Sequence, residues 1–280
     1  MGYLGLNDLI KRALEEDVGY GDITTYHLIP REQRARGLFV AKTPGIVAGI
    51  KVSRAVFNHI DTASEFEIIK RDGEEIQAGD VIAMVRGSAR TLLTGERVAL
   101  NFLQRLSGIA TKTHRLVEMI ASSHAQILDT RKTTPGLRVL EKYAVRIGGG
   151  RNHRYGLFDG AMIKDNHIRA VGSITRAVAT LREKIPITVK IEVEVETLEQ
   201  LREALEAQAD IIMLDNMDVT MIKQAVQAAA GRAILEASGG INESNLVEVA
   251  GTGVDFISIG ALTHSAPSLD ISFDFGEANL

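Results

Sequence analysis

The chain of 280 residues contains no cysteine, and no stretch of it stays apolar for the roughly 20 residues that a membrane-spanning helix needs. The absence of cysteine excludes disulfide bonds, thiolate metal ligands and a cysteine nucleophile. The N-terminus has an amphipathic pattern that ends in acidic residues, unlike the apolar centre of a signal peptide. We therefore expect neither secretion nor a membrane partner, and we expect a cytoplasmic location.

The chain also lacks a strong excess of one charge. Charged residues make up 24% of it, the formal net charge is -4, and there is no basic tail or basic stripe interleaved with aromatic residues. Nucleic acid is therefore not expected as a partner, because its recognition requires a basic footprint. With 45% hydrophobic residues, the chain is long enough for a substantial core and for two structural units.

The first part of the chain, residues 1–108, mixes short helices with strands. A helix is expected from Asn7 to Asp17, strands are expected at residues 36–42 and 45–50, and residues 66–87 contain turn signals between alternating apolar runs. A long helix is expected over residues 94–122, with a break near Gly108. This pattern predicts a small antiparallel sheet flanked by helices.

From Ala125 onward, short apolar runs alternate with helical segments, as in repeated β/α units. Six strands are predicted, at residues 125–130, 161–166, 188–195, 211–216, 233–238 and 256–261. Helix starts are indicated by a capping box of Thr197 and Gln200 and by Asn242 as an N-cap. These signals predict an incomplete (β/α) barrel over residues 109–266. Residues 267–280 form a tail that could return to the N-terminal domain.

Ionisable or glycine residues stand at the end of every predicted barrel strand. They are Asp129 to Lys132, Lys164 to His167, Glu192 with Glu194, Asp215 with Asn216, Glu236 with Ser238 to Gly240, and Gly260 with Ala261. A purely structural barrel tolerates one or two polar strand ends as caps and ion pairs, but six are difficult to explain in this way. Because barrels of this kind place their sites at the C-terminal strand ends, a functional site is predicted there.

Basic residues are concentrated between the first two of these strands. From Asp129 to His167 there are eight lysines and arginines and four aspartates and glutamates, so this segment carries +4 and the rest of the chain -8. A local basic cluster on an acidic protein attracts a small polyanion into a cleft. The residues favoured as ligand contacts are Arg131, Lys132, His153, Arg154 and Lys164. Lys142 and Arg146 share a face of a predicted helix over residues 136–146 and are expected to face water.

The last two strands end in glycine turns, at residues 237–241 and 259–261. Backbone N–H groups of such turns bind phosphate, and the end of a barrel is the usual place for this. Glu194 and Asp215 could stabilise a developing cation, contact sugar hydroxyls or hold Mg²⁺ through its outer shell. Glu192 and Glu196 lie on the same side of the strand as Glu194 by parity, so periodicity does not choose among the three. The residues predict a site for a phosphate-bearing sugar and a second polyanion.

Long motifs give the chain a family resemblance. They are EEDVGYGDIT, ERVALNFLQRLSGIAT, LDTRKTTPGLR, GGGRNHRYGLFDGAMIKDNH, EVEVETLEQ, MLDN, SGGI and VDFISIGALTHS. With these motifs the sequence closely resembles the quinolinate phosphoribosyltransferase family, also called nicotinate-nucleotide pyrophosphorylase (carboxylating), nearly from end to end. The resemblance implies an N-terminal α/β sandwich-like domain, an incomplete barrel and a homodimer in which one subunit's N-terminal domain covers the partner's barrel mouth. A higher oligomer stays open.

The resemblance also implies a pentosyltransferase activity in NAD biosynthesis. Phosphoribosyl would pass from phosphoribosyl pyrophosphate to the ring nitrogen of quinolinate, which would lose its 2-carboxylate to give nicotinate mononucleotide, pyrophosphate and CO₂. Mg²⁺ would act through the substrate and water, with no direct protein ligand. For EEDVGYGDIT (residues 15–24), physical reasoning predicts only a helix end and a glycine turn, and the role of this segment stays open.

Residue roles follow from the same resemblance. The residues implied to bind the quinolinate carboxylates are Arg131, Lys132, His153 and Arg154, with Arg97 reaching across from the other subunit. Lys164 would face the substrates, and Glu194 and Asp215 would bind the ribose region, so these three are the catalytic candidates. The 5-phosphate would be held by Ser238, Gly239, Gly240, Gly260 and Ala261, and Thr130 and Ile259 complete the expected substrate-binding set.

Two alternatives remain at this point. The first keeps the fold and changes the acceptor, as in a nicotinate-specific enzyme or a molybdenum-associated relative of the family. The second is a carrier module, because residues 71–87 look like the hairpin of a biotinyl or lipoyl domain. Such a domain needs a lysine at the tip of an exposed turn, whereas Lys70 precedes the Asp72-Gly73 turn, and this reading also leaves the strand-end residues unexplained.

Overall fold

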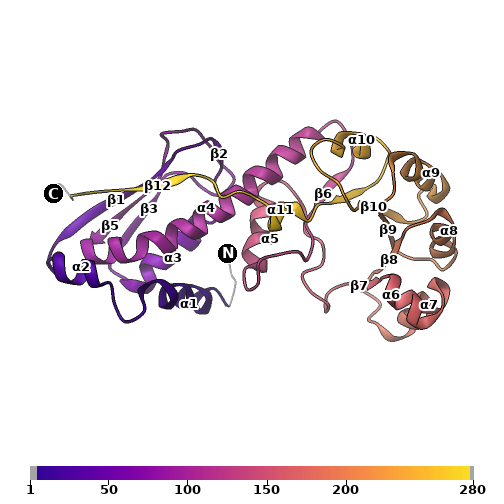
Figure 1. Cartoon of the computed structure of the whole chain (residues 1–280), viewed down its shortest axis with the longest axis horizontal. Helices are drawn as coiled ribbons and strands as arrows, with labels where there is room; N and C mark the ends of the chain where they lie inside the picture. The colour runs from indigo at the N-terminus through magenta and orange to yellow at the C-terminus, as the bar shows by residue number, and fades with distance from the viewer. Residues whose placement is uncertain (1–4, 278–280) are drawn as a thin grey trace. The chain divides into compact units, whose positions relative to one another are not determined.

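The computed structural model describes residues 5–277 and divides the chain into two compact units (Figure 1). Unit 1 comprises residues 1–114, 134–149 and 266–280, and unit 2 comprises residues 115–133 and 150–265. The expected barrel domain, residues 109–266, ends within one residue of unit 2, but its residues 109–114 and 134–149 fall in unit 1. Residues 1–4 of the expected first domain and residues 278–280 of the expected tail lie outside the described part.

Unit 1 is built on an antiparallel sheet with the strand order β12-β1-β5-β3. Its elements are α1 (Leu6–Val18), α2 (Ile23–Leu28), β1 (Arg34–Ala41), β2 (Gly45–Ile46), α3 (Ile50–Ile60), β3 (Glu65–Ile68), β4 (Glu75–Ile76), β5 (Val81–Ser88), α4 (Ala89–Met119), which continues into unit 2, α5 (Arg138–Ile147) and β12 (Ile271–Glu277). Alternate residues of β1 are buried, as expected for a strand with one face on a core. Phe39 anchors that core, with ring centroids 6.2 Å from Phe57 and 5.1 Å from Phe273. The predicted antiparallel sheet with helices is confirmed.

Two expectations for unit 1 are wrong in detail. Residues 45–50 form a strand only over Gly45–Ile46, because Gly49 turns the chain at φ 92° and starts α3. The helix α4 runs without a break through Gly108. A Cβ at Gly108 would lie 2.0 Å from the carbonyl oxygen of Pro267, so the glycine permits close contact with the C-terminal segment and does not end the helix.

The segment of residues 15–24 joins two helices of unit 1. Helix α1 ends at Val18, and Gly19 follows as its C-cap at φ 54°. Asp22 is then the N-cap of α2, accepting a hydrogen bond from the Thr25 N–H at 2.9 Å. Hydrogen bonding to Thr25 and Thr94 keeps the pKa of Asp22 below its usual value, although burial opposes the shift. The motif therefore has a structural part in capping α2.

Unit 2 contains the predicted six strands in a parallel sheet, in the order β6-β11-β10-β9-β8-β7. Its elements are β6 (Gln126–Leu128), β7 (Ala161–Ile163), α6 (Asp165–Val171), α7 (Ile174–Lys184), β8 (Ile191–Val195), α8 (Leu198–Glu206), β9 (Ile211–Asp215), α9 (Val219–Ala229), β10 (Ile234–Ser238), α10 (Leu246–Ala250), β11 (Phe256–Ser258) and α11 (Ala261–His264). Each strand lies within its predicted range. The strands are largely buried, as in a parallel sheet covered by helices.

The predicted helix caps of unit 2 are confirmed in part. Thr197 accepts a hydrogen bond from the Gln200 N–H at 3.2 Å and caps α8. The Gln200 side chain binds the N–H of Glu196 at 2.7 Å, one residue before the position that a capping box requires. Asn242 is not the N-cap of α10, which begins after Asn245. Its side chain instead accepts the N–H of Ser244 at 2.9 Å and closes the preceding turn.

The expectation for Lys142 on α5 is wrong, because its side chain is fully buried, whereas that of Arg146 is exposed. The neighbouring Glu141 is also fully buried and accepts hydrogen bonds from Arg105 at 2.8 Å and from the Thr134 hydroxyl at 2.8 Å. Helical spacing predicts which residues share a face of the helix. It does not predict whether a charged residue on that face is buried in the folded protein.

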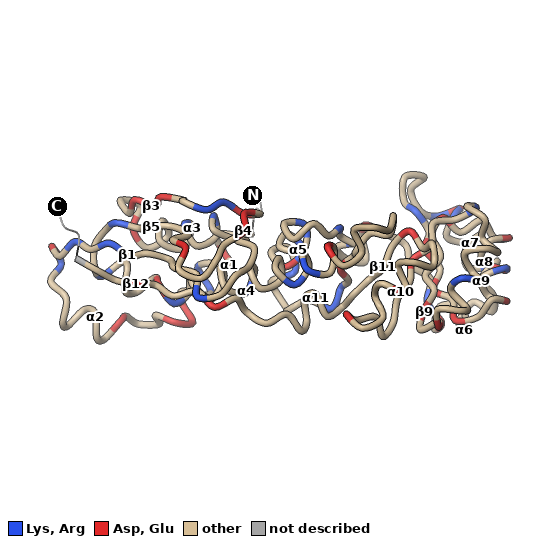
Figure 2. Tube along the Cα trace, turned by 90° about the horizontal axis from the view of Figure 1, so that it is seen from above, with Lys and Arg blue, Asp and Glu red and all other residues tan. Residues whose placement is uncertain are grey.

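The C-terminal segment belongs to unit 1. Strand β12 pairs antiparallel with β1, and the Gln104 side chain donates a hydrogen bond to the carbonyl of Ile271 at 2.7 Å. Lysines and arginines, and aspartates and glutamates, occur along the trace of both units (Figure 2). Within residues 5–277, no helix is both long enough and apolar enough to cross a membrane.

Candidate active site

A cavity of about 590 Å³ opens at the C-terminal strand ends of unit 2. Eleven of the fifteen expected site residues line it: Thr130, Arg131, Lys132, His153, Arg154, Lys164, Glu194, Asp215, Ser238, Gly239 and Gly240. The remaining lining residues are Met162, Met213, Asn216, Glu236 and Ser258. The lining is drawn from β7 to β10, from the ends of β6 and β11 and from the loops that follow β6, so the barrel gathers residues that are up to 128 positions apart in the sequence.

Four expected residues are not among those that line this cavity. Ile259 is buried, and Gly260 and Ala261 lie at the start of α11. Gly260 is next to the cavity, because a Cβ on it would lie 3.0 Å from the side chain of Lys132. Arg97 is exposed on α4 in unit 1.

Arg154 is a cation of the cavity whose guanidinium is bound within the protein. Its guanidinium donates a hydrogen bond to the carbonyl of Gly160 at 2.9 Å and contacts the sulfur of Met162 at 3.5 Å. Burial lowers the pKa of Arg154, and the nearby charge of Arg131 lowers it further, while Glu192 opposes the shift. An arginine remains protonated in proteins, so this shift describes a cation that is costly to bury and gains from an anionic ligand.

Lys164 and Glu194 form an ion pair across the cavity mouth. The lysine follows β7, and the glutamate lies on the neighbouring strand β8. The Glu194 side chain is 14% exposed and that of Lys164 43%, so the pair can be reached by a ligand. A substrate anion that binds Lys164 would compete with Glu194 for it.

A glycine turn after β10 forms another wall of the cavity. Gly239 has φ 90°, and a Cβ on it would lie 2.2 Å from the side-chain oxygen of Asn216. Asn216, itself at φ 53°, donates its backbone N–H to the carbonyl of Ser238 at 2.9 Å and its side-chain amide to Asp215 at 2.8 Å. The turn therefore requires glycine, which leaves its backbone open to a ligand.

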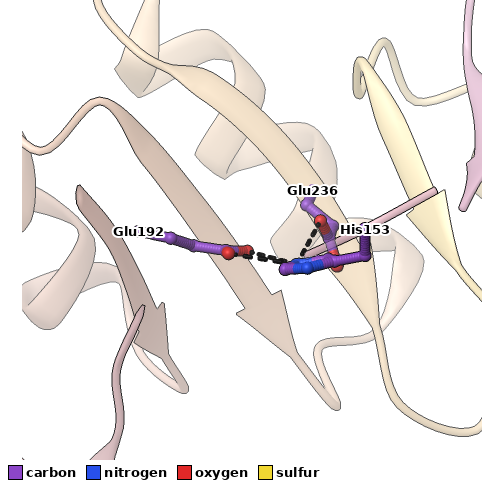
Figure 3. A group of neighbouring side chains, drawn as sticks. All are labelled: His153, Glu192 and Glu236. Atoms are coloured by element: carbon purple, nitrogen blue, oxygen red, sulfur yellow. Dashed lines mark hydrogen bonds and ion pairs between the residues drawn. The ribbon is translucent and has the colours of Figure 1, made fainter. Parts of the chain in front are cut away.

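His153, partly buried, and the buried Glu192 and Glu236 form a cluster in which the imidazole lies between the two carboxylates (Figure 3). Nε2 of His153 is 3.0 Å from Oε2 of Glu192 on β8 and 3.5 Å from Oε2 of Glu236 on β10. Burial raises the pKa of Glu236 to about 8, and repulsion from Glu192 acts in the same direction. These three residues also form the group of side chains, among the described ones, that could hold a metal ion.

Both glutamates of this cluster stand at predicted strand ends, but the expected substrate-binding set does not include them. Parity placed Glu192 on the same side of β8 as Glu194, and that signal was correct: both point to the barrel interior, with Glu192 buried and Glu194 at the cavity. Glu196 is exposed beyond the strand. The depth of a residue within a barrel depends on the strand stagger, which period-2 patterning does not contain.

The cavity combines Arg131, Lys132, Arg154 and Lys164 with the carboxylates Glu194 and Asp215 and with a glycine turn. Four cations at the C-terminal end of an incomplete barrel define a class of enzyme that binds a small polyanion. The backbone N–H groups of the glycine turn can bind a phosphate of that ligand.

Comparisons with known proteins identify the family within this class. The models of the quinolinate phosphoribosyl transferase N-terminal domain and C-terminal domain match residues 22–107 and 109–274. The chain therefore belongs to the quinolinate phosphoribosyltransferase family and is a pentosyltransferase.

Individual relatives match over nearly their whole length. A probable nicotinate-nucleotide pyrophosphorylase [carboxylating] of Bacillus subtilis (strain 168) is 48% identical over 279 residues, covering 100% of this chain and 96% of the relative. The nicotinate-nucleotide pyrophosphorylase [carboxylating] of Mycobacterium leprae (strain TN) is 45% identical, covering 95% and 96%. The crystal structure of NadC from Streptococcus pyogenes superposes with a TM-score of 0.96 at 44% identity, covering 100% of both chains. The fold class and the family that the sequence motifs indicate are thus confirmed.

Proposed function

We propose that this chain transfers phosphoribosyl from phosphoribosyl pyrophosphate to the ring nitrogen of quinolinate and releases the 2-carboxylate as CO₂, giving nicotinate mononucleotide and pyrophosphate for NAD biosynthesis. Family membership supports the reaction. The observation that carries it to this site is the set of four cations around one cavity, beside a glycine turn. A pyridine dicarboxylate and a ribose that carries a phosphate and a pyrophosphate are both polyanions, and this cavity offers a cation or backbone donor to each part of them.

The quinolinate carboxylates are assigned to Arg131, Lys132 and Arg154, with His153 and Thr130 beside them. The planar fork of an arginine can hold a carboxylate through two hydrogen bonds. Arg154 is already fixed through Gly160, so little side-chain freedom is lost on binding. Orienting the diacid in this way places the ring nitrogen toward the ribose.

The phosphoribosyl group is assigned to the opposite wall. Ser238, Gly239 and Gly240, with Ile259, Gly260 and Ala261 near Lys132, would bind the 5-phosphate through backbone N–H groups. Glu194 and Asp215 would contact the ribose and stabilise the positive charge that develops on it as pyrophosphate leaves. Lys164 would exchange its contact with Glu194 for the pyrophosphate or a carboxylate.

Mg²⁺ is proposed as the cofactor. The oxygen donors Glu194 and Asp215 at the cavity suit a hard cation that keeps part of its water shell, so they would hold it through water and substrate oxygens. When bound, Mg²⁺ would neutralise charge on the pyrophosphate. Decarboxylation needs no dedicated base in this scheme. The bond between C2 and the carboxylate breaks, the electron pair stays on C2, where the adjacent cationic ring nitrogen stabilises it, and a proton from water then forms the C2–H bond of the product.

A homodimer with a shared site is proposed for the assembly, and a cytoplasmic location for the enzyme. Each unit exposes large apolar side chains of the kind that subunit contacts cover: Ile23 and Leu28 in unit 1 are 78% and 72% exposed, and Leu157 and Phe158 in unit 2 are 75% and 85% exposed. Arg97 would then complete the partner's site from α4.

Subunit exchange tests this assembly. Mixing inactive Arg97→Ala and Lys164→Ala proteins should restore part of the activity, because one of the two sites in each heterodimer then has both residues. Absence of recovery, after mass spectrometry has verified exchange, would place Arg97 in the site of its own subunit or outside any site.

The choice of acceptor tests the proposed reaction. Purified protein with phosphoribosyl pyrophosphate and Mg²⁺ should convert quinolinate but use nicotinate about 5- to 150-fold less efficiently, because the missing carboxylate leaves a cation unpaired at a cost of about 1 to 3 kcal/mol. Faster turnover of nicotinate, or none of either acid, would contradict the proposal and favour the alternative with another acceptor.

A further inference from the structure

Both ring nitrogens of His153 are engaged within the protein. Nδ1 accepts a hydrogen bond from the backbone N–H of Arg154 at 2.7 Å, and Nε2 faces the carboxylates of Glu192 and Glu236 (Figure 3). A nitrogen that accepts an N–H carries no proton of its own. The ring is therefore the neutral form with its proton on Nε2, and this proton points to the glutamates.

The two glutamates cannot both be ionised at this depth. Glu192 is 4% exposed and Glu236 is 2% exposed, and the two approach a single N–H donor from β8 and β10, the strands on either side of β9. Two buried carboxylates that share a site favour one proton between them. The Ser258 hydroxyl favours the ionised form of Glu236, but burial and the charge of Glu192 outweigh it and favour the protonated acid.

We propose that His153 is a positioning residue, in which a neutral imidazole donates its Nε2 proton to a singly protonated pair of Glu192 and Glu236 and accepts the backbone N–H of Arg154. The proposal rests on the function proposed above and refines it. Arg154 is then held at two points, through its N–H by His153 and through its guanidinium by Gly160. The arginine, and not the imidazole, contacts the substrate carboxylate.

The same geometry argues against a metal ion in this cluster, although the ligand atoms of the three residues lie within 4.8 Å of one another. A histidine that binds a metal through Nε2 presents an unprotonated nitrogen there and donates a hydrogen bond from Nδ1. Here Nδ1 faces a donor, so Nε2 must keep its proton. A shared proton suits the cluster better than a cation.

Other charged groups around the cluster come from each neighbouring element. They are Asp129 after β6, Arg131 and Arg154 in the loops, Lys164 after β7, Glu194 on β8 and Asp215 on β9. Asp129 accepts the backbone N–H of His153 at 2.9 Å and fixes the main chain of this residue. Burial raises the pKa of Glu236 to about 8, so the glutamate pair is expected to change its protonation between pH 7 and 9.

The tautomer can be measured in the ligand-free protein, without reference to activity. Full-length protein labelled with ¹⁵N-histidine should give a His153 signal of a neutral ring with the proton on Nε2 at pH 7, assigned by its loss in His153→Gln or, if that variant does not fold, in His153→Asn. An imidazolium ring, a proton on Nδ1, or a shift on addition of Zn²⁺, Mn²⁺ or Mg²⁺ alone would overturn the proposal. An enzyme that fails to turn over quinolinate while showing the expected tautomer would refute the proposed function instead.

The pH profile tests the shared proton. In the wild type, kcat/KM for quinolinate should fall by about tenfold per pH unit once Glu236 ionises, because a second buried anion then competes for Arg154. In Glu236→Gln, the alkaline limb, normalised to the maximum of each variant, should move upward by at least one pH unit. Glu196→Gln, which removes an exposed carboxylate just beyond β8, is the matched control and should keep the wild-type limb. An unchanged limb in Glu236→Gln would overturn the proposal.

Discussion

Glu236 should give the stability of the barrel unit an unusual dependence on pH. Burial raises its pKa from 4.5 to about 8 in the folded protein. Between these two values the folded chain keeps a proton that the unfolded chain releases. The contribution of this group to stability is therefore fully present below pH 4.5 and is lost as the pH rises through about 8.

The magnitude follows from proton linkage. One proton held only by the folded state changes the free energy of unfolding by about 1.4 kcal/mol per pH unit. Glu236→Gln removes this titration and keeps the shape of the protonated acid. Relative to the wild type, the variant should gain about 1.4 kcal/mol per unit between pH 5.5 and 7.5, hence about 3 kcal/mol over the interval.

Urea unfolding at several pH values measures this effect, with Glu196→Gln as the control for loss of an exposed carboxylate. The difference between Glu236→Gln and the wild type should rise with pH, whereas the Glu196→Gln difference should stay flat. Parallel stability curves for the wild type and Glu236→Gln would refute the reasoning, since they would mean that Glu236 ionises alike in the folded and unfolded chains.

Three further substitutions test the site and the fold. Arg154→Ala should lower kcat/KM for quinolinate by about 10- to 100-fold or more, as expected for a lost charged hydrogen bond. Arg146→Ala, which removes an exposed cation, is the control. Near-normal kinetics in a folded Arg154→Ala variant would remove Arg154 from the site. Gly239→Ala places a Cβ 2.2 Å from Asn216 and should raise KM for phosphoribosyl pyrophosphate at least about tenfold in steady-state assays; an unchanged KM would exclude the turn from phosphate binding. Gly108→Ala should destabilise unit 1 by about 1 to 3 kcal/mol in thermal unfolding, because the Cβ meets the Pro267 carbonyl; a stable variant would show that the C-terminal segment can move aside.

The barrel strands were predictable because each is an apolar run between helical segments, and all six lie within their predicted ranges. The strand-end rule then located most of the cavity, from Arg131 to Gly240. Sequence patterning did not predict the burial of Lys142 or the continuity of α4 through Gly108. The contact between Gly108 and Pro267 joins segments distant in sequence, and local periodicity contains no information about such contacts.

The cluster of His153, Glu192 and Glu236 illustrates the same limit within the site. The sequence indicates that all three residues belong near the barrel mouth, but a polar residue below the mouth and one at its rim have the same parity. Only the stagger of β8 and β10 decides which carboxylate is buried and which meets the ligand. The hydrogen bond from Arg154 to His153 then decides which nitrogen of the ring carries the proton.

The most direct test of the account is the fate of isotopically labelled quinolinate. With phosphoribosyl pyrophosphate and Mg²⁺, the purified enzyme should release labelled CO₂ from quinolinate labelled in the 2-carboxylate, in amounts equal to the pyrophosphate formed, and none from quinolinate labelled in the 3-carboxylate. Pyrophosphate release without labelled CO₂, or no reaction with a folded protein, would contradict the assignment of the barrel cavity to this reaction.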